Sequence, residues 1–179
     1  MAMGRKSFRH ALATLFAAVL CWPAAAGTWT EYSYPDAGFS VQFPGQPKVE
    51  NGTYVAADGA LIPAWIYSLR RGKGLFIVTV ADFSDRPAEH DKVIADAADL
   101  VRKTGEVRAD LQARVKGQYG QQLSVVGKDG SLSMVAIFFA DRRLYQVIGT
   151  SFPPNADEGS GDNIRFQQSL DFLGDLGYR

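Results

Sequence analysis

The chain has little cysteine, little histidine and no excess of charge, and each shortage removes a class of function. Its 179 residues include one cysteine and two histidines, and 19 basic residues are balanced by 19 acidic ones. Cys21 lies in an apolar N-terminal run, so the chain after it has neither a disulfide nor a thiol nucleophile. Because no basic block is present, the sequence predicts no nucleic-acid partner.

The first 26 residues have the pattern of a signal peptide. A basic start with Arg5, Lys6 and Arg9 precedes an apolar run over residues 11–22, and a small-residue pattern predicts cleavage after Ala26. The run is shorter than the roughly 20 residues of a membrane span, so we expect none after processing. We therefore expect a periplasmic or extracellular location. Sec export is favoured over twin-arginine export because Lys6 replaces the second arginine.

Residues 27–179 are predicted to form a single domain. This length is enough for one hydrophobic core, which a domain of this size can build without disulfides. Without the three basic residues of the leader, 16 basic residues face 19 acidic ones, a net charge of −3. No polybasic run remains that would attract anionic lipid.

Alternating and β-rich runs predict an antiparallel sheet built of hairpins and a meander. The strongest signal is the pair 132–139 and 144–150 around a polar turn at 140–143. Both faces of 132–139 are apolar or small, so we expect this hairpin at the centre of the sheet under helices. Further strands are expected at 29–34, 39–43, 48–56, 61–70, 75–83, 107–115 and 118–126.

Local features refine four of these strands. The alternation of 39–43 and of 107–115 predicts one buried and one solvated face for each. Pro63 predicts an edge or a bulge at the start of its strand. Gly120 predicts a break in the strand 118–126.

Two helices are expected to pack on the sheet. The first begins after a cap at Ser84 or Asp85 and ends before Gly105, and its apolar positions recur at helical spacing. That stripe consists of Val93, Ile94, Ala97, Ala98, Leu100 and Val101. The second helix is expected to be capped by Asp162 or Asn163. Strands joined by short turns, with helices packed on them, define the α+β class.

Three segments together resemble a known kind of domain. Residues 34–47 read YPDAGFSVQFPGQP, residues 142–147 read RRLYQV, and residues 165–170 read RFQQSL. These resemble exported bacterial domains with a GFSVxFPxxP opening, which are similar to the PsbP/Mog1 type of fold. The resemblance implies an antiparallel sheet sandwiched by helices and a non-enzymatic accessory or binding role. It implies no catalytic residue, because its motifs are turns, core aromatics and a helix cap.

One acidic cluster offers an alternative, a secreted hydrolase. Asp82, Asp85 and Glu89 lie at a strand end and a helix start, and two carboxylates facing each other across a cleft could act as acid and base. Acidic residues at a helix start also suit the helix dipole and its cap, which is the stronger interpretation. His90, the only histidine after residue 26, has no nucleophile elbow to serve, so we expect it to be solvated.

A second cluster offers a Ca²⁺-stabilised structural module. Asp157, Glu158, Asp162 and Asn163 are oxygen-rich and surround two glycines, which suits Ca²⁺, although the EF-hand spacing is absent. We predict no metal and no cofactor, and we expect this set to be structural.

The leading prediction is a binding role. Most aromatic residues should lie in the core, but tyrosine and tryptophan are favoured at interfaces, and we expect Tyr32, Trp65 and Tyr145 to line a groove. The sequence thus predicts an exported, soluble, non-enzymatic binding or accessory domain. Its partner, a protein or a small ligand, stays open.

Overall fold

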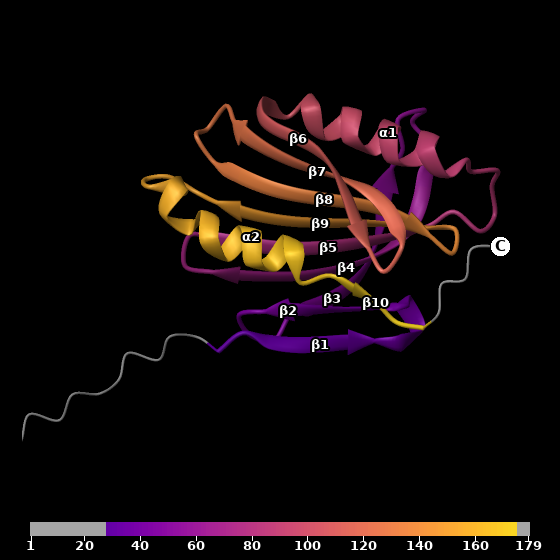
Figure 1. Cartoon of the computed structure of the whole chain (residues 1–179), viewed down its shortest axis with the longest axis horizontal. Coiled ribbons are helices and arrows are strands. Elements are labelled where there is room, and N and C mark those ends of the chain that lie inside the picture. The colour runs from indigo at the N-terminus through magenta and orange to yellow at the C-terminus, as the bar shows by residue number, and fades with distance from the viewer. Residues whose placement is uncertain (1–27, 175–179) are drawn as a thin grey trace, which may run out of the picture.

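The strands of the molecule form two antiparallel sheets (Figure 1). The computed structural model describes residues 28–174, and the predicted signal peptide at 1–26 lies outside this range. The larger sheet has the order β3-β4-β5-β9-β8-β7-β6 and the smaller one β1-β2-β10. The larger sheet comprises β3 (Lys48–Val55), β4 (Leu61–Arg71), β5 (Gly74–Asp82), β6 (Gly105–Val115), β7 (Gln118–Gly127), β8 (Leu132–Ala140) and β9 (Arg143–Ser151). The smaller sheet comprises β1 (Thr30–Tyr34), β2 (Phe39–Phe43) and β10 (Asp171–Phe172).

The larger sheet is covered on both faces. Helix α1 (His90–Arg102) packs on one face, and α2 (Ser160–Gln168) lies with the smaller sheet on the other (Figure 1). Each face has its own core, and β8 contributes to both, with Ile137 0% and Phe138 1% exposed. This arrangement confirms the predicted α+β class, with an antiparallel sheet under two main helices.

Helix α2 is attached to the sheet by one aromatic ring and two buried amides. The Phe166 ring lies 4.8 Å from the Phe43 ring in β2 and 5.2 Å from the Phe76 ring in β5. Asn163 Nδ2 donates to Ser151 Oγ at 2.9 Å, and Gln167 Nε2 donates to the Val135 carbonyl at 2.5 Å. Because Phe166 contacts both sheets, it joins three elements that are distant in sequence.

Helix α1 begins later than predicted. Glu89 is its N-cap residue, whereas the expected caps Ser84 and Asp85 belong to a loop. Arg142 holds that loop: its Nη2 lies 2.6 to 3.0 Å from three carbonyl oxygens, those of Phe83, Ser84 and Arg86. These long-range bonds satisfy backbone carbonyls that would otherwise accept hydrogen bonds within a helix. The helix therefore starts only after this loop.

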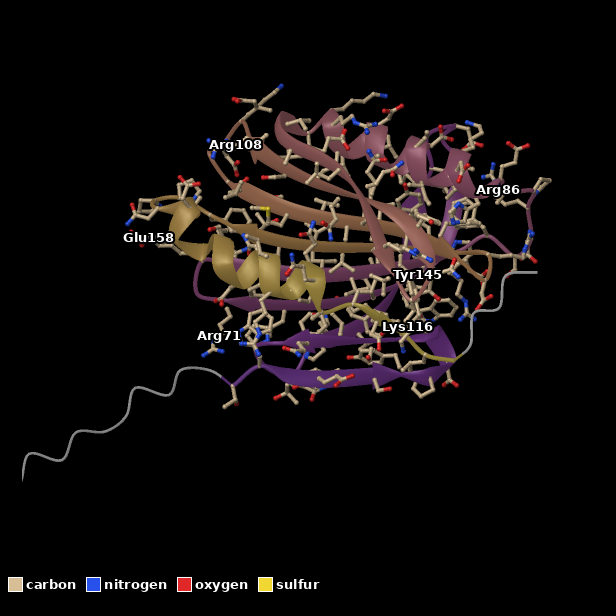
Figure 2. The ribbon with its side chains drawn as sticks, viewed as in Figure 1. Arg71, Arg86, Arg108, Lys116, Tyr145 and Glu158 are labelled. Atoms are coloured by element: carbon tan, nitrogen blue, oxygen red, sulfur yellow. The ribbon has the colours of Figure 1, made fainter. Side chains whose placement is uncertain are left out.

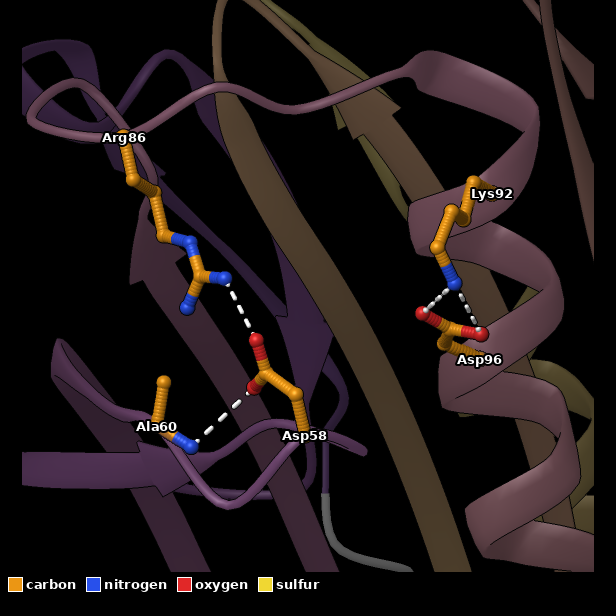
Figure 3. Close-up of polar contacts among 5 residues, drawn as sticks. All are labelled: Asp58, Ala60, Arg86, Lys92 and Asp96. Carbon is orange, nitrogen blue, oxygen red and sulfur yellow. Dashed lines mark hydrogen bonds and ion pairs between the residues drawn. The ribbon is translucent and has the colours of Figure 1, made fainter.

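A second contact fixes the same loop to a strand connection. Arg86 Nη2 donates to Asp58 Oδ2 at 2.6 Å, and Asp58 Oδ1 accepts the Ala60 N–H at 3.0 Å (Figure 3). Figure 3 also shows Lys92 paired with Asp96 one turn further along α1. These pairs are exposed and screened by water, so the Arg86–Asp58 contact serves chiefly to orient the loop.

Helix α1 ends before Gly105, as predicted, but Gly105 is the first residue of β6 and not the residue that follows the helix cap. A Cβ at Gly105 would lie 2.0 Å from the Val126 carbonyl oxygen, so close packing explains the glycine. Gly120 likewise does not break its strand, because β7 continues through it. Pro63 behaves as predicted: it pairs with Thr53 of β3, while the pairing with β5 begins at Ala64, so the strand has an edge there.

The two alternating strands are buried differently from the prediction. Ser40 of β2 is 2% exposed, because β10 pairs with β2 at that residue and the end of α2 reaches over its neighbour Gln42. In β6 a bulge between Val107 and Ala109 turns the two halves of the alternation to opposite faces. Leu111 is 61% exposed, and of the expected face only Ala113 is buried.

In the described part of the chain, neither helix has the length and apolarity to cross a membrane.

Candidate functional site

An aromatic groove opens between the two sheets. Its volume is about 620 Å³, and we call it the Trp65 groove. One wall is the end of β1 with the 3-10 turn η1 (Pro35–Ala37), and the other is formed by β3 and β4. It is lined by Ser33, Tyr34, Pro35, Asp36, Ala37, Val49, Trp65 and Tyr67.

The turn wall is fixed by its own sequence and by β9. Pro35 starts η1, and Gly38 closes it with a φ of 76° and a 3.0 Å bond from its N–H to the Pro35 carbonyl. From beneath, Tyr145 Oη donates to the Ala37 carbonyl at 2.9 Å, and Arg143 Nη1 donates to the Asp36 carbonyl at 3.0 Å. The wall therefore depends on residues more than 100 positions later in the chain.

The sheet wall follows from strand periodicity. Trp65 and Tyr67 are two residues apart in β4, so their side chains share a face, and Val49 of β3 is the cross-strand partner of Tyr67. Tyr67 is 4% exposed, whereas Val49 is 49% exposed at the outer end of the groove. The wall thus runs from a buried aromatic floor to an apolar rim at the edge of the sheet.

Tyr34 lies where the two walls meet. Its ring centroid is 4.3 Å from that of Tyr67, and its hydroxyl is buried without a hydrogen-bond partner among residues 28–174. Burial, followed by the neighbouring Tyr67 and Tyr32, raises the pKa of Tyr34 to about 12. The hydroxyl is therefore neutral at ordinary pH, and Asp36 is the one residue lining the groove that carries a charge.

Of the three aromatic residues predicted to line a groove, only Trp65 does so. Tyr32 is half-buried on β1, with its ring 6.1 Å from that of Phe43 in the core. The prediction for Tyr145 is wrong: it is 2% exposed, between the large sheet and the small one (Figure 2). The sheet order puts β9 centrally between β5 and β8, so a ring on its inner face cannot reach a partner.

The sequence analysis did not assign Tyr34, Tyr67, Val49 or the η1 turn to a groove. The turn has a local signal, the motif YPDAGF at 34–39, whose proline and glycine are typical of a tight turn. The other three could not be assigned, because nothing local shows that β1 and β3 approach each other.

The structure does not assemble the acidic hydrolase site. Asp82 Oδ1 accepts the Ser84 N–H at 2.9 Å, and hydrogen bonds from Ser84 hold the pKa of Asp82 below its ordinary value. Asp82 is thus a structural acceptor, whereas a general acid would need a raised pKa. Asp85 and Glu89 are exposed on the loop held by Arg142.

The Ca²⁺ set is not assembled either. Within residues 28–174, no three histidine, cysteine, aspartate or glutamate side chains are grouped closely enough to hold a metal ion. Asn163 is 0% exposed and turned toward the sheet, where its Nδ2 bonds Ser151 Oγ. Asp157 and Glu158 are exposed, so the oxygen ligands face different environments.

The role of Tyr145 as a support for the groove wall gives a stability prediction. Tyr145→Phe keeps the ring but leaves the Ala37 carbonyl without its partner, so we expect the free energy of unfolding to fall by about 1–3 kcal/mol. Urea denaturation measures the change. Tyr119→Phe, at a tyrosine that is 52% exposed, is the control and should have no effect. Equal stability of the two variants would show that the buried bond contributes nothing.

Comparisons with known proteins support the fold. A scan against protein-family models gives no match, and neither does a search of curated proteins. Among solved structures, the chain is similar to PsbP (CyanoP) from Synechocystis sp. PCC 6803, with a TM-score of 0.53 and 13% identity, covering 86% of this chain and 97% of that one. At this identity the likeness concerns the fold alone.

Two further structures are more distant. A protein of unknown function from Pseudomonas aeruginosa has a TM-score of 0.41 and 12% identity, covering 76% of this chain and 91% of that one. The Ran-binding protein Mog1p from Saccharomyces cerevisiae has a TM-score of 0.45 and 11% identity, covering 86% of this chain and 100% of that one. With the sheet order and helix placement above, the chain has the PsbP/Mog1-like fold that its sequence motifs implied.

Proposed function

We propose that the chain is an exported, non-enzymatic binding domain that captures an extended segment of a protein partner along β3. The observation that carries the proposal is an aromatic groove beside the free edge of a sheet. The signal-peptide pattern of residues 1–26 supports export to the periplasm or beyond the cell.

Strand β3 offers backbone groups for pairing. It is the outermost strand of the larger sheet, and its only strand partner in the described range is β4. A partner segment added along the outer side of β3 would extend the sheet by β-strand addition, in which main-chain hydrogen bonds give affinity. Alternate side chains of that segment would then point to the face on which Val49 and Trp65 lie.

The charged side chains of β3 do not lie on the face of the strand that lines the groove. Lys48 and Glu50 form an ion pair at 2.7 Å and flank Val49, so their side chains lie on the opposite face of the strand. Charges commonly protect edge strands from pairing, but here none lies on the groove face of β3. Trp65 and Val49 favour apolar side chains in the partner, and Asp36 at the turn favours a lysine or arginine beside them.

A selection experiment tests this function. The purified protein is immobilised and used to select from a phage-displayed library of random 12-residue peptides. We expect selected peptides to alternate apolar and polar residues and to include a basic residue. Trp65→Ala should weaken the binding of a selected peptide by tenfold or more, because large aromatic side chains dominate interface energies.

The control variant is Leu61→Ala, on the same strand at a side chain that is 71% exposed and outside the groove. It should bind the peptide as the wild type does. N-methylation of alternate peptide amides should abolish binding, because it removes the main-chain bonds. If selected peptides bind Trp65→Ala with unchanged affinity, or tolerate N-methylation at every amide, the proposal is wrong.

A further inference from the structure

A second hollow lies on the other side of the larger sheet. It has a volume of about 920 Å³ and opens between the first half of α1 and the β6–β7 hairpin, and we call it the α1 cleft. Phe139 and Ile94, which are 6% and 8% exposed, belong to the core beneath α1 and also line the cleft. The cleft shares no lining residue with the Trp65 groove.

The hairpin wall presents a regular set of polar side chains. Gln112 pairs with Gln121 across the two strands, and Arg114 pairs with Tyr119, so all four side chains share one face. This face looks toward α1, because Gln121 is in turn the partner of Ile137, which packs in the core under that helix. The cleft wall therefore carries the amides of Gln112 and Gln121 and one phenol ring, and a third glutamine, Gln118, also lines the cleft.

Two of these side chains are held in place by neighbouring residues. The amide nitrogen of Gln121 donates to Asp110, whose other oxygen accepts Arg102 Nε at 2.9 Å. The Arg114 guanidinium lies 5.0 Å from the centroid of the Tyr119 ring, which is itself 52% exposed. Gln121 keeps its carbonyl oxygen available as an acceptor, and Tyr119 presents the ring face that Arg114 does not cover.

The helix wall adds hydrogen-bonding groups of both kinds. His90 Nδ1 lies 2.8 Å from Asp91 Oδ1, and the His90 ring makes an edge contact with Phe139 at 6.1 Å between centroids. Small residues, Ala88 and Ala95, line the same wall and leave the space open.

The charge of the lining decides the class of ligand. No lysine or arginine is among the residues that line the cleft, and Arg114, on the same hairpin face, is exposed and already stacked on the Tyr119 ring, so a phosphate or carboxylate ligand would meet no desolvated counter-charge. Asp91 and Asp141 are its acids, and the Asp91 side chain is fully exposed, so water screens its attraction for a cation. Amides, a histidine and ring faces together suit a neutral ligand whose hydroxyls both donate and accept.

We propose that the α1 cleft binds a neutral saccharide, with a sugar ring stacked on Tyr119 and its hydroxyls bonded to Gln112, Gln121 and His90. The apolar face of a sugar ring matches the exposed face of Tyr119, and its hydroxyls match the amides around that ring. The volume lies within the roughly 300–1,000 Å³ of small-molecule sites.

Isothermal titration calorimetry tests the proposal with three neutral trisaccharides: maltotriose, cellotriose and N,N′,N″-triacetylchitotriose. We expect at least one to bind the purified protein. Tyr119→Ala should weaken that binding by tenfold or more, whereas Tyr119→Phe should retain it, because the ring face and not the hydroxyl makes the contact. Gln112→Ala should weaken it severalfold.

Trp65→Ala is the control that separates the two sites, and it should bind the sugar normally. A sugar whose binding is lost with Trp65→Ala but kept with Tyr119→Ala would overturn the proposal by placing it in the other groove. Absence of heat with all three sugars would also overturn it. So would binding of spermidine in their place, which would mark a cation site.

Discussion

Replacing Phe166 by alanine is expected to lower the free energy of unfolding by about 3–5 kcal/mol, the usual cost of deleting a buried aromatic ring. Phe166 is 0% exposed and contacts Phe43 of the small sheet and Phe76 of the large one. The cavity would lie between three elements whose mutual contacts hold it open, so it cannot collapse fully. A chain of this size should lose about 6–20 °C in melting temperature.

The matched control lies on the same helix. Ile164→Ala removes a side chain that is 38% exposed, and we expect it to cost less than about 1 kcal/mol. Urea denaturation of both variants separates packing from helix propensity, because each replaces a large residue by alanine within α2. Equal losses would show that Phe166 contributes through the helix alone and not through the two sheets.

The packing of Phe166 also affects the shape of the Trp65 groove. The groove is formed between β1 with η1 and β3 with β4, so its width depends on how the small sheet sits on the large one. Phe166 is one of the contacts that set this position, as are Tyr145 and Phe172, whose rings lie 5.1 Å apart. We therefore expect residues outside the groove to control its shape more than the lining residues do.

The features that the sequence predicted well have local signals. The stripe of α1 recurs at helical spacing, and five of its six residues are buried in the structure, Val93, Ile94, Ala97, Ala98 and Val101. The two-sided apolar pattern of 132–139 correctly predicted a central strand covered on both faces. In both cases the periodicity lies within one element, so no knowledge of its neighbours is needed.

The features that it missed depend on distant contacts. The start of α1 is delayed by Arg142, which lies 56 to 59 residues from the carbonyls it holds. Tyr145 is buried against Phe39 and Phe172 of the small sheet, and its hydroxyl donates to the Ala37 carbonyl, 108 residues earlier. An aromatic residue in a strand looks the same in sequence whether it faces a core or a groove. Whether the residue faces a core or a groove depends on the position of its strand in the sheet.

The role of Gly120 also depends on a contact with a neighbouring strand that its local sequence does not show. Gly120→Ala is expected to lower the free energy of unfolding by about 3 kcal/mol, at the upper end of the usual range for overpacking. The new Cβ would lie 2.2 Å from the Ile137 carbonyl oxygen and 2.4 Å from Cδ1 of Phe138. Neither can withdraw easily, because the backbone of β8 pairs on both sides and Phe138 is 1% exposed.

The control for Gly120→Ala is Gly161→Ala, the same substitution at a position of α2 where a side chain has space. A Cβ there would meet nothing within 4 Å, and alanine favours a helix over glycine by up to about 1 kcal/mol. We expect opposite signs from the two variants in urea denaturation. If Gly120→Ala were as stable as the wild type, the close approach of β8 would not constrain the residue at position 120. A large loss would show instead that it makes room for an aromatic ring crossing the strand.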